Sequence, residues 1–249
     1  MFELSSETRV SELQAESQAM MDTLKKTGIF RDGDDPHVTI AELCYSFGLH
    51  PKILLMPLAR ALATEAPTDI DVSELDGMTL TQVVENIESK HHAYLREMMP
   101  ATLELVNRVL NAHGANDPRL AELHELFRNM SEELENHMLH EEEALFPMCR
   151  DMEIDGKITP TRCGEAVGGP IACMENDHDR AREQLAQLST LTDNFAVPNY
   201  ACMTYRNMIE QLKLFNQDMA VHIHKENEVL FPGAVKKQTA LRKGLLKKA

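Results

Sequence analysis

The sequence of 249 residues contains no tryptophan, and aromatic residues make up only 5% of it. Almost no segment alternates polar and apolar residues with a period of two, which argues against a β-sheet protein. The longest apolar run, ILLMPLA, is far too short to cross a bilayer. The first ten residues, MFELSSETRV, lack a basic stretch followed by an apolar one, so we expect no secretory signal.

Positive charge is also scarce, since 25 Lys and Arg face 40 Asp and Glu, which gives a formal net charge of −15. A chain this acidic is a poor general binder of nucleic acid or of an anionic membrane, so we expect neither as a partner. The five cysteines are odd in number and form no CxxC pair. This usage favours free thiols in a reducing cytoplasm over a disulfide framework.

Helical periodicity is what the sequence does contain. Apolar residues recur at spacings of three and four, and Ala, Leu, Glu and Met are abundant. We expect four long helices, over about 79–111, 118–150, 171–191 and 200–231, with short loops inside each pair and a longer loop between the pairs. This all-α pattern is typical of an up-down four-helix bundle.

Composition divides the chain into three parts. Residues 1–77 show short helical stretches, and the linker-like segment EAPTDIDVSELDGM at 65–78 follows them, so we expect a small N-terminal helical domain in residues 1–77. Residues 78–235 carry the long helices of the bundle. Residues 236–249, KKQTALRKGLLKKA, form a basic C-terminal tail that we expect to be a solvated helix or a frayed end.

One phrase occurs twice in the bundle. HMLHEEEALFP at 137–147 and HIHKENEVLFP at 222–232 share His, three residues, Glu, three residues and Leu-Phe-Pro. Residues i and i+4 lie on one face of a helix, so each phrase places a histidine one turn from a glutamate. A single HxxxE is more often a surface pair or a core histidine than a metal site. Its repetition favours the metal site.

Each repeat is preceded by one histidine on the expected partner helix. His92 lies 45 residues before His137, and His178 lies 44 residues before His222. The midpoint of the first pair falls at Gly114–Ala115, inside an expected turn, so both histidines lie about 20 residues, or roughly 30 Å, up the hairpin. The second pair is less evenly spaced about its expected loop, TDNFAVPN.

Two such hairpins packed together would bring four histidines and two glutamates to one level of the core. Burying two carboxylates without a cation is very costly, and a mixture of imidazole and carboxylate favours iron, then manganese or zinc. We expect the two histidines of each hairpin to share one metal and both glutamates to bridge. The predicted dinuclear site consists of His92, His137, Glu141, His178, His222 and Glu226.

A rival arrangement of the same helices remains open. ESKH (Glu88, His91) and ENDH (Glu175, His178) are both ExxH, the motif of ferritin-like carboxylate sites. With the two glutamates of the repeats they would also hold two metals, but the histidines of both repeats would have no role. Mutation of His137 separates the schemes, because only the first loses metal.

Two acidic residues flank the predicted ligands. Glu133 lies one turn before His137, and Asp177 is next to His178. These carboxylates either orient the imidazoles or line a polar path to the metals, or they are exposed acids on an acidic surface. The sequence suggests no other catalytic residue. Three further histidines flank ligands and are expected to be solvated: His91, His140 and His224.

The combined motifs resemble one known family. His92 with REMMP, ELENHMLHEEEALFPM, GGPIACMENDHD and HIHKENEVLFP resemble the hemerythrin-like di-iron proteins for repair of iron centres, the RIC family or YtfE/ScdA type, over about 78–235. The resemblance implies the same six ligands around two non-haem iron ions, bridged by carboxylates and an oxo group. Oxygen-carrying hemerythrins have another histidine four residues after the one on the third helix. Here that position is Arg182, which would leave the irons more open.

The resemblance also implies a function. Proteins of this family act under nitrosative or oxidative stress, bind nitric oxide at the di-iron site and support repair of damaged iron–sulfur clusters, whose proteins would be partners. Two alternatives stay open: an enzyme that reduces nitric oxide or peroxide, and a carrier or sensor that binds oxygen or nitric oxide without turnover. The N-terminal segment GIFRDGDDPHVTIAEL lacks the family's adjacent cysteine pair, and Cys44 lies alone downstream.

Overall fold

The computed structural model describes residues 2, 4–47, 49, 51–62, 70–160 and 166–246. Over these residues the protein is all-α, and the β structure is limited to an isolated bridge between Arg9 and Thr39. The predicted fold class is confirmed. In the described part of the chain, no helix is both long enough and apolar enough to span a bilayer.

The described chain forms two compact units. One unit, called here the bundle body, consists of residues 85–140 and 176–223, and the second unit consists of residues 1–84, 141–175 and 224–249. The domain boundaries expected at residues 77 and 235 stay predictions, and part of the expected linker, residues 63–69, lies outside the described residues.

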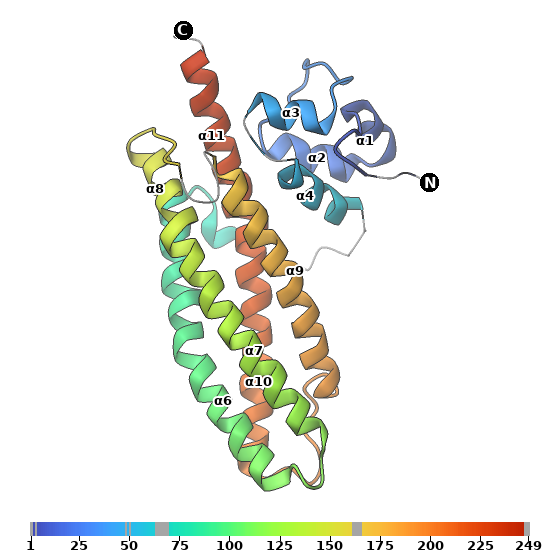
Figure 1. Ribbon diagram of the computed structural model, residues 1–249, viewed down its shortest axis with the longest axis vertical. Helices are drawn as coiled ribbons and strands as arrows, with labels where there is room; N and C mark the ends of the chain where they lie inside the picture. The colour runs from blue at the N-terminus through green and yellow to red at the C-terminus, as the bar shows by residue number, and fades with distance from the viewer. Residues whose placement is uncertain are drawn as a thin grey trace. The chain divides into compact units, whose positions relative to one another are not determined.

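The bundle body contains four long helices that run side by side (Figure 1). α6 (Ala93–His113) and α7 (Arg119–His140) form one hairpin, and parts of α9 (Gly168–Leu191) and α10 (Met203–Lys225) form the other. α6 continues through Pro100 without interruption of the helix. The helices predicted from apolar spacing are therefore present, two hairpins with a long connection between them.

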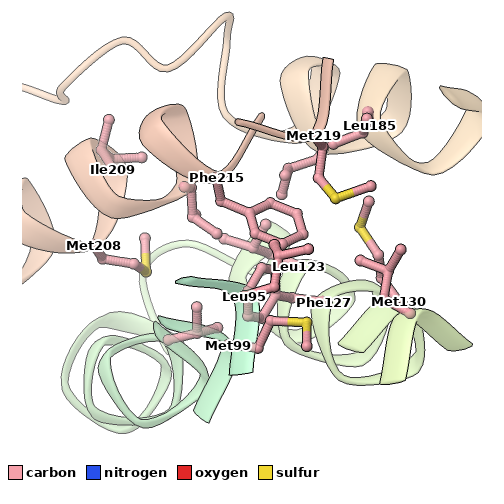
Figure 2. Packing of buried hydrophobic residues seen from close by; sticks show 14 of the residues in the cluster. Leu95, Met99, Leu123, Phe127, Met130, Leu185, Met208, Ile209, Phe215 and Met219 are labelled. Carbon is pink, nitrogen blue, oxygen red and sulfur yellow. The ribbon is translucent and has the colours of Figure 1, made fainter. Parts of the chain in front are cut away.

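The core of the bundle body is made of Met, Leu, Ile, Val and Phe side chains from all four helices, which point toward one another in Figure 2. Phe127 of α7 and Phe215 of α10 lie at its centre, edge to face, with ring centroids 5.1 Å apart. On α7, Leu120, Leu123 and Phe127 follow one another at spacings of three and four, which explains why this face is buried.

Both hairpin connections lie at one end of the bundle body, called here the loop end (Figure 1). Asp117 is buried there, and its carboxylate accepts hydrogen bonds from the hydroxyls of Tyr200 and Tyr205 at 2.9 and 3.1 Å. Arg119 donates to Asp117 at 3.0 Å and to Asp193 at 2.7 Å. Asp117 therefore ties the two connections together.

The second unit begins with short helices, α1 (Val10–Glu16), α2 (Gln18–Lys26), α3 (Ile40–Ser46) and α4 (Lys52–Leu62). Ser17 caps α2 by accepting the N–H of Met20, and Thr39 forms a capping box with Glu42 at the start of α3. The short helices expected near the N-terminus are therefore present.

The remaining helical elements lie between the four long helices in sequence or flank them. They are η1 (Ser73–Leu75), α5 (Leu80–Ile87), η2 (Glu88–His92), η3 (Glu141–Leu145), α8 (Phe146–Ile154), η4 (Glu226–Leu230) and α11 (Phe231–Leu246). Lys237 of α11 binds Glu153 of α8 at 2.8 Å. Gln238 is 0% exposed and accepts the N–H of Val167 at 2.9 Å. The basic C-terminal segment is thus helical to Leu246 and partly buried, where we expected solvation or fraying.

Candidate metal centre

Three π-helical turns lie at the predicted ligands. η2 ends at His92, while η3 begins at Glu141 and η4 begins at Glu226. A π turn adds a residue to a helix turn and so re-aims the side chains on it, and such turns are frequent at functional sites. Three of the six predicted ligands are therefore positioned by locally widened helix.

The repeated Leu-Phe-Pro explains two of these turns. Pro147 and Pro232 each stand two residues after a π turn and have no N–H to donate to the carbonyl one turn earlier. The π turn lies in each helix just before the proline, where this hydrogen bond is missing. Phe146 and Phe231 are buried beside these prolines. The repeat therefore encodes a backbone feature as well as two side chains.

Four buried histidines of the bundle body form what we call the histidine layer. His92 and His222 meet edge to face with ring centroids 5.1 Å apart. The rings of His137 and His178 lie 4.8 Å apart, and their Nε2 atoms are separated by 3.2 Å. None of the four is more than 4% exposed. The histidines predicted from two separate hairpins are therefore brought together in pairs.

Two buried glutamates complete the set, since Glu141 and Glu226 are both 0% exposed. Each follows a histidine of the layer by one turn of continuous helix. In two groups, one ligand atom per residue lies within 4.8 Å of the others. These groups are His92, Glu141, His222, Glu226 and His137, Glu141, His178, Glu226. Both glutamates belong to both groups, as carboxylates that bridge two cations require.

The donor set fits a pair of first-row metal ions. Two carboxylates out of contact with water need positive charge nearby, because an isolated buried carboxylate is very unfavourable. Imidazole and carboxylate together suit iron, manganese or zinc. The residues present are thus consistent with the predicted dinuclear centre.

The grouping of the histidines differs from our expectation. We expected the two histidines of one hairpin, such as His92 and His137, to share a metal. The structure instead groups one histidine from each hairpin, because the helices face each other across the bundle rather than along a hairpin. Within the described residues, neither group includes Glu88, His91 or Glu175 of the rival ExxH arrangement.

His91 is buried, and the expectation that it would be solvated is wrong. Its ring stacks parallel on that of His222 at 5.2 Å, and its Nδ1 lies 2.8 Å from Oδ1 of Asp218. A signal was present in the sequence, since Asp218 precedes His222 by one helical turn. His140 is exposed, as expected, and His224 is half-buried.

The two flanking acids have different surroundings. Asp177 Oδ2 lies 3.6 Å from Nδ1 of His137, and this imidazole lowers the pKa of Asp177 below its ordinary value. Glu133 accepts a hydrogen bond from Gln184 at 3.1 Å and lies 3.9 Å from Arg180. Asp177 therefore faces the histidine layer, and Glu133 belongs to a surface network.

A pocket of about 220 Å³ in the bundle body reaches the layer at His137 and His178. Glu133, Asp177 and Arg180 also line it. Arg182, which stands where oxygen carriers have a histidine, binds Asp179 at 2.7 Å. The volume of this pocket exceeds that of a diatomic ligand.

One charged residue near the glutamates was missed in the sequence. Lys225 is 2% exposed, and its ammonium lies 2.6 Å from a carboxylate oxygen of Glu74. Glu74 belongs to η1, about 150 positions earlier in the chain. No periodic pattern links two residues this far apart, so only the structure could pair them.

The chain is similar to known proteins over the region just described. Residues 84–234 match the Hemerythrin HHE cation binding domain. A curated relative named iron-sulfur cluster repair protein YtfE, from Yersinia pseudotuberculosis, is 32% identical over 176 residues, which cover 71% of this chain and 74% of the relative. The protein of that name from Dickeya chrysanthemi is 30% identical over 175 residues, 70% of this chain and 73% of the relative. The matched region includes all six candidate ligands.

Proposed function

This chain belongs to the hemerythrin HHE cation-binding family, and we propose that it is a non-haem di-iron protein that acts in repair of iron–sulfur clusters damaged by nitrosative or oxidative stress. The name shared by its relatives supports the role in repair. The observation that carries the metal proposal is the pair of four-residue groups that share both buried glutamates.

The six residues divide into terminal and bridging ligands in this proposal. His92 and His222 would hold one iron, and His137 and His178 would hold the other, because they fall into those pairs in the two groups. Glu141 and Glu226 belong to both groups and would be shared by the two ions. When bound, reduced iron supplies open coordination positions and electrons to a small ligand such as nitric oxide or dioxygen.

The surroundings of the site control access and orientation. The near-complete burial of the histidine layer excludes bulk water, and the pocket at His137 and His178 provides a path for a diatomic ligand. Asp177 places a carboxylate 3.6 Å from the outer ring nitrogen of His137, which favours positive charge on that side of the layer. Arg182 stands where oxygen carriers have a histidine ligand, and its side chain binds Asp179 instead. This supports a metal coordination position that stays open to small molecules.

The N-terminal helices supply no paired thiols to this chemistry. Cys44 is buried, and burial raises the pKa of its thiol to about 12, so it stays protonated and unreactive near neutral pH. Iron–sulfur proteins damaged by nitric oxide or oxidants are the proposed partners, and the cytoplasm is the proposed location. Electrons would come from a donor other than Cys44.

Metal analysis with Mössbauer spectra of the anaerobically purified protein tests the centre. We expect about two irons per chain, and loss of both in the Glu141→Ala, Glu226→Ala variant, because removal of both bridges leaves only two imidazoles per ion. His140→Ala, one residue from Glu141 but exposed, is the matched control and should keep its iron. Protein that stays folded and takes up no iron would refute the proposal.

Nitric oxide added anaerobically to the reduced protein distinguishes repair from its alternatives. Reactivation of a nitric-oxide-damaged iron–sulfur enzyme by the iron-loaded protein, but not by the Glu141→Ala, Glu226→Ala variant, is the result expected for repair. Multiple-turnover release of nitrous oxide without reactivation would favour a reductase. A stable nitrosyl without either would favour a carrier or sensor.

A further inference from the structure

The loop end of the bundle body holds an exposed cysteine against a histidine. Cys202 Sγ lies 3.2 Å from Nε2 of His113, the last residue of α6. The carbonyl of Cys202 accepts the N–H of Arg206 at 3.0 Å, which makes Cys202 the residue that caps α10. The sulfur is therefore bounded by an imidazole and by the N-terminus of a helix of 23 residues.

His113 is held in place by aromatic rings. Its ring meets Tyr205 edge to face, with centroids 5.5 Å apart, and lies 6.5 Å from the ring of Tyr200. Both tyrosine hydroxyls donate to Asp117. The imidazole therefore needs no rearrangement to act on the sulfur, and an ordered Cys–His pair results.

The electrostatics of this pair favour a thiolate. The backbone N–H groups of Tyr205 and Thr204 and the imidazole of His113 together lower the pKa of the Cys202 thiol to about 7. Burial has the opposite effect on Cys44 and Cys149, whose pKa values it raises to about 12.

Charged groups at the loop end form one network beside the tyrosines. Asp117 accepts from both tyrosines, and Arg119 donates to it at 3.0 Å from two nitrogens. The second charge near Arg119 is Asp193, at 2.7 Å. Tyr200 and Tyr205 have raised pKa values, by the bond to Asp117 and by burial respectively, and so stay neutral near pH 7. The side chain in hydrogen-bond contact with the sulfur is thus His113.

We propose that Cys202, paired with His113, is a thiol modification site that exchanges with low-molecular-mass disulfides. His113 accepts the proton of the Cys202 thiol, and the thiolate attacks one sulfur of the disulfide. A new sulfur–sulfur bond forms to Cys202, the bond inside the disulfide breaks, and the released thiolate takes the proton back from His113. The sulfur of Cys202 is oxidised from thiol to mixed disulfide. One sulfur of the reagent is reduced to a free thiol, and the other stays in the mixed disulfide.

The surface around Cys202 admits such a reagent. Tyr200 and Met203, on either side of it in sequence, are 56% and 72% exposed, so no side chain from them buries the sulfur. The described chain offers one other exposed cysteine, Cys173 on α9, which serves as the internal comparison. This proposal does not depend on the iron site.

Reaction of the full-length protein with 2,2′-dithiodipyridine and with oxidised glutathione tests the proposal. All forms carry Cys163→Ser, because Cys163 lies outside the described residues. At pH 6.5 we expect one fast phase equal to one thiol, lost in Cys202→Ser and kept in Cys173→Ser. The rate should rise with pH about a midpoint near 7, the pKa of the thiol. Mass spectrometry of peptides should locate the glutathione adduct on Cys202.

His113→Gln isolates the role of the imidazole. We expect the fast phase to slow about threefold at pH 6.5 for each unit by which the pKa of the thiol rises, because the thiolate fraction falls nearly tenfold while the more basic thiolate is about threefold more nucleophilic. Circular dichroism and iron content should match the parent, which shows that folding and the iron site are intact. The proposal is overturned if Cys202 reacts no faster than Cys173, or if folded His113→Gln reacts at the parent rate.

Discussion

Histidine is used in two regions of the bundle body under opposite conditions. In the histidine layer, His92, His137, His178 and His222 are almost completely buried and have two buried carboxylates as neighbours. At the loop end, His113 is half-buried and faces an exposed sulfur. Burial with carboxylates favours a bound cation, whereas partial exposure beside a thiol favours proton transfer. The chemistry of an imidazole is thus set by its surroundings.

The largest effect should follow from loss of one histidine of the layer. His137→Ala is expected to lose at least one of two irons, because the group around Glu141, His178 and Glu226 loses an imidazole. His91→Ala, in contrast, should keep both irons, since His91 belongs to neither group. Iron content per chain measures both. Iron loss in His91→Ala together with retention in His137→Ala would instead support the ExxH arrangement.

Metal removal should destabilise the layer more than the loop end. Ligand that binds only the folded state stabilises it by about 4 kcal/mol when free ligand is a thousand times its Kd. Chelation should therefore lower Tm by several degrees and raise hydrogen exchange in helices beside Glu141 and Glu226. A Glu141→Gln, Glu226→Gln variant without metal should be more stable than the metal-free parent, because it buries no charge. Equal Tm values for those two metal-free forms would contradict the expectation.

Asp117 provides the corresponding test at the loop end. Asp117→Ala removes the acceptor of the Tyr200 and Tyr205 hydroxyls and the partner of Arg119, and we expect it to cost about 2–3 kcal/mol of unfolding free energy. Denaturant unfolding measures the cost. Iron content should be unchanged, because this contact lies outside both metal groups. Loss of iron in the folded variant would show that the two regions are coupled.

Acid should weaken the same contact. The hydrogen bonds from Arg119 and the two tyrosines lower the pKa of Asp117 from 3.8 to about 2. A carboxylate with a depressed pKa stabilises the folded state fully above the unfolded pKa, and this contribution falls as pH drops from about 4 to about 2. The parent should therefore lose more stability than Asp117→Asn across this interval. Parallel stability curves for the two proteins would argue against the assignment.

The smallest effect is expected on the outer face of α7. Arg128 pairs with Glu125 and Glu132 at 2.8 and 2.9 Å, but all three side chains are exposed. Exposed pairs contribute little because water and salt screen them, so Arg128→Ala should shift Tm by less than about 2 °C. Iron content and thiol reactivity should both stay at parent values. A larger shift would mean that α7 depends on surface charge more than its burial indicates.

Much of the site could be predicted because its signals are local. The repeated HxxxE-xxx-LFP places a histidine, a glutamate and a backbone irregularity within eleven residues, and a helix converts that spacing into one face. The single histidines, His92 and His178, followed from their nearly equal distances to the repeats, 45 and 44 residues. The grouping across hairpins could not be predicted, because loop conformations decide which helices face each other.

Other contacts required distant segments to meet. His113 and Cys202 are 89 positions apart, and Lys225 and Glu74 are about 150 apart. Neither pair shares a helix face or a motif, so sequence spacing contains no information on them. The contact of His91 could be predicted in part, because its partner Asp218 lies one helical turn before His222. The burial of His91 could not, because it depends on how α10 packs against it.

By itself, the sequence determined the helices, their order and the six polar side chains available at one level, because hydrogen bonds and apolar spacing within a helix are local. Only the tertiary structure decided which histidines converge, that His91 is buried and that Cys202 meets His113. These outcomes depend on how separate helices pack, and packing is set by the whole core at once.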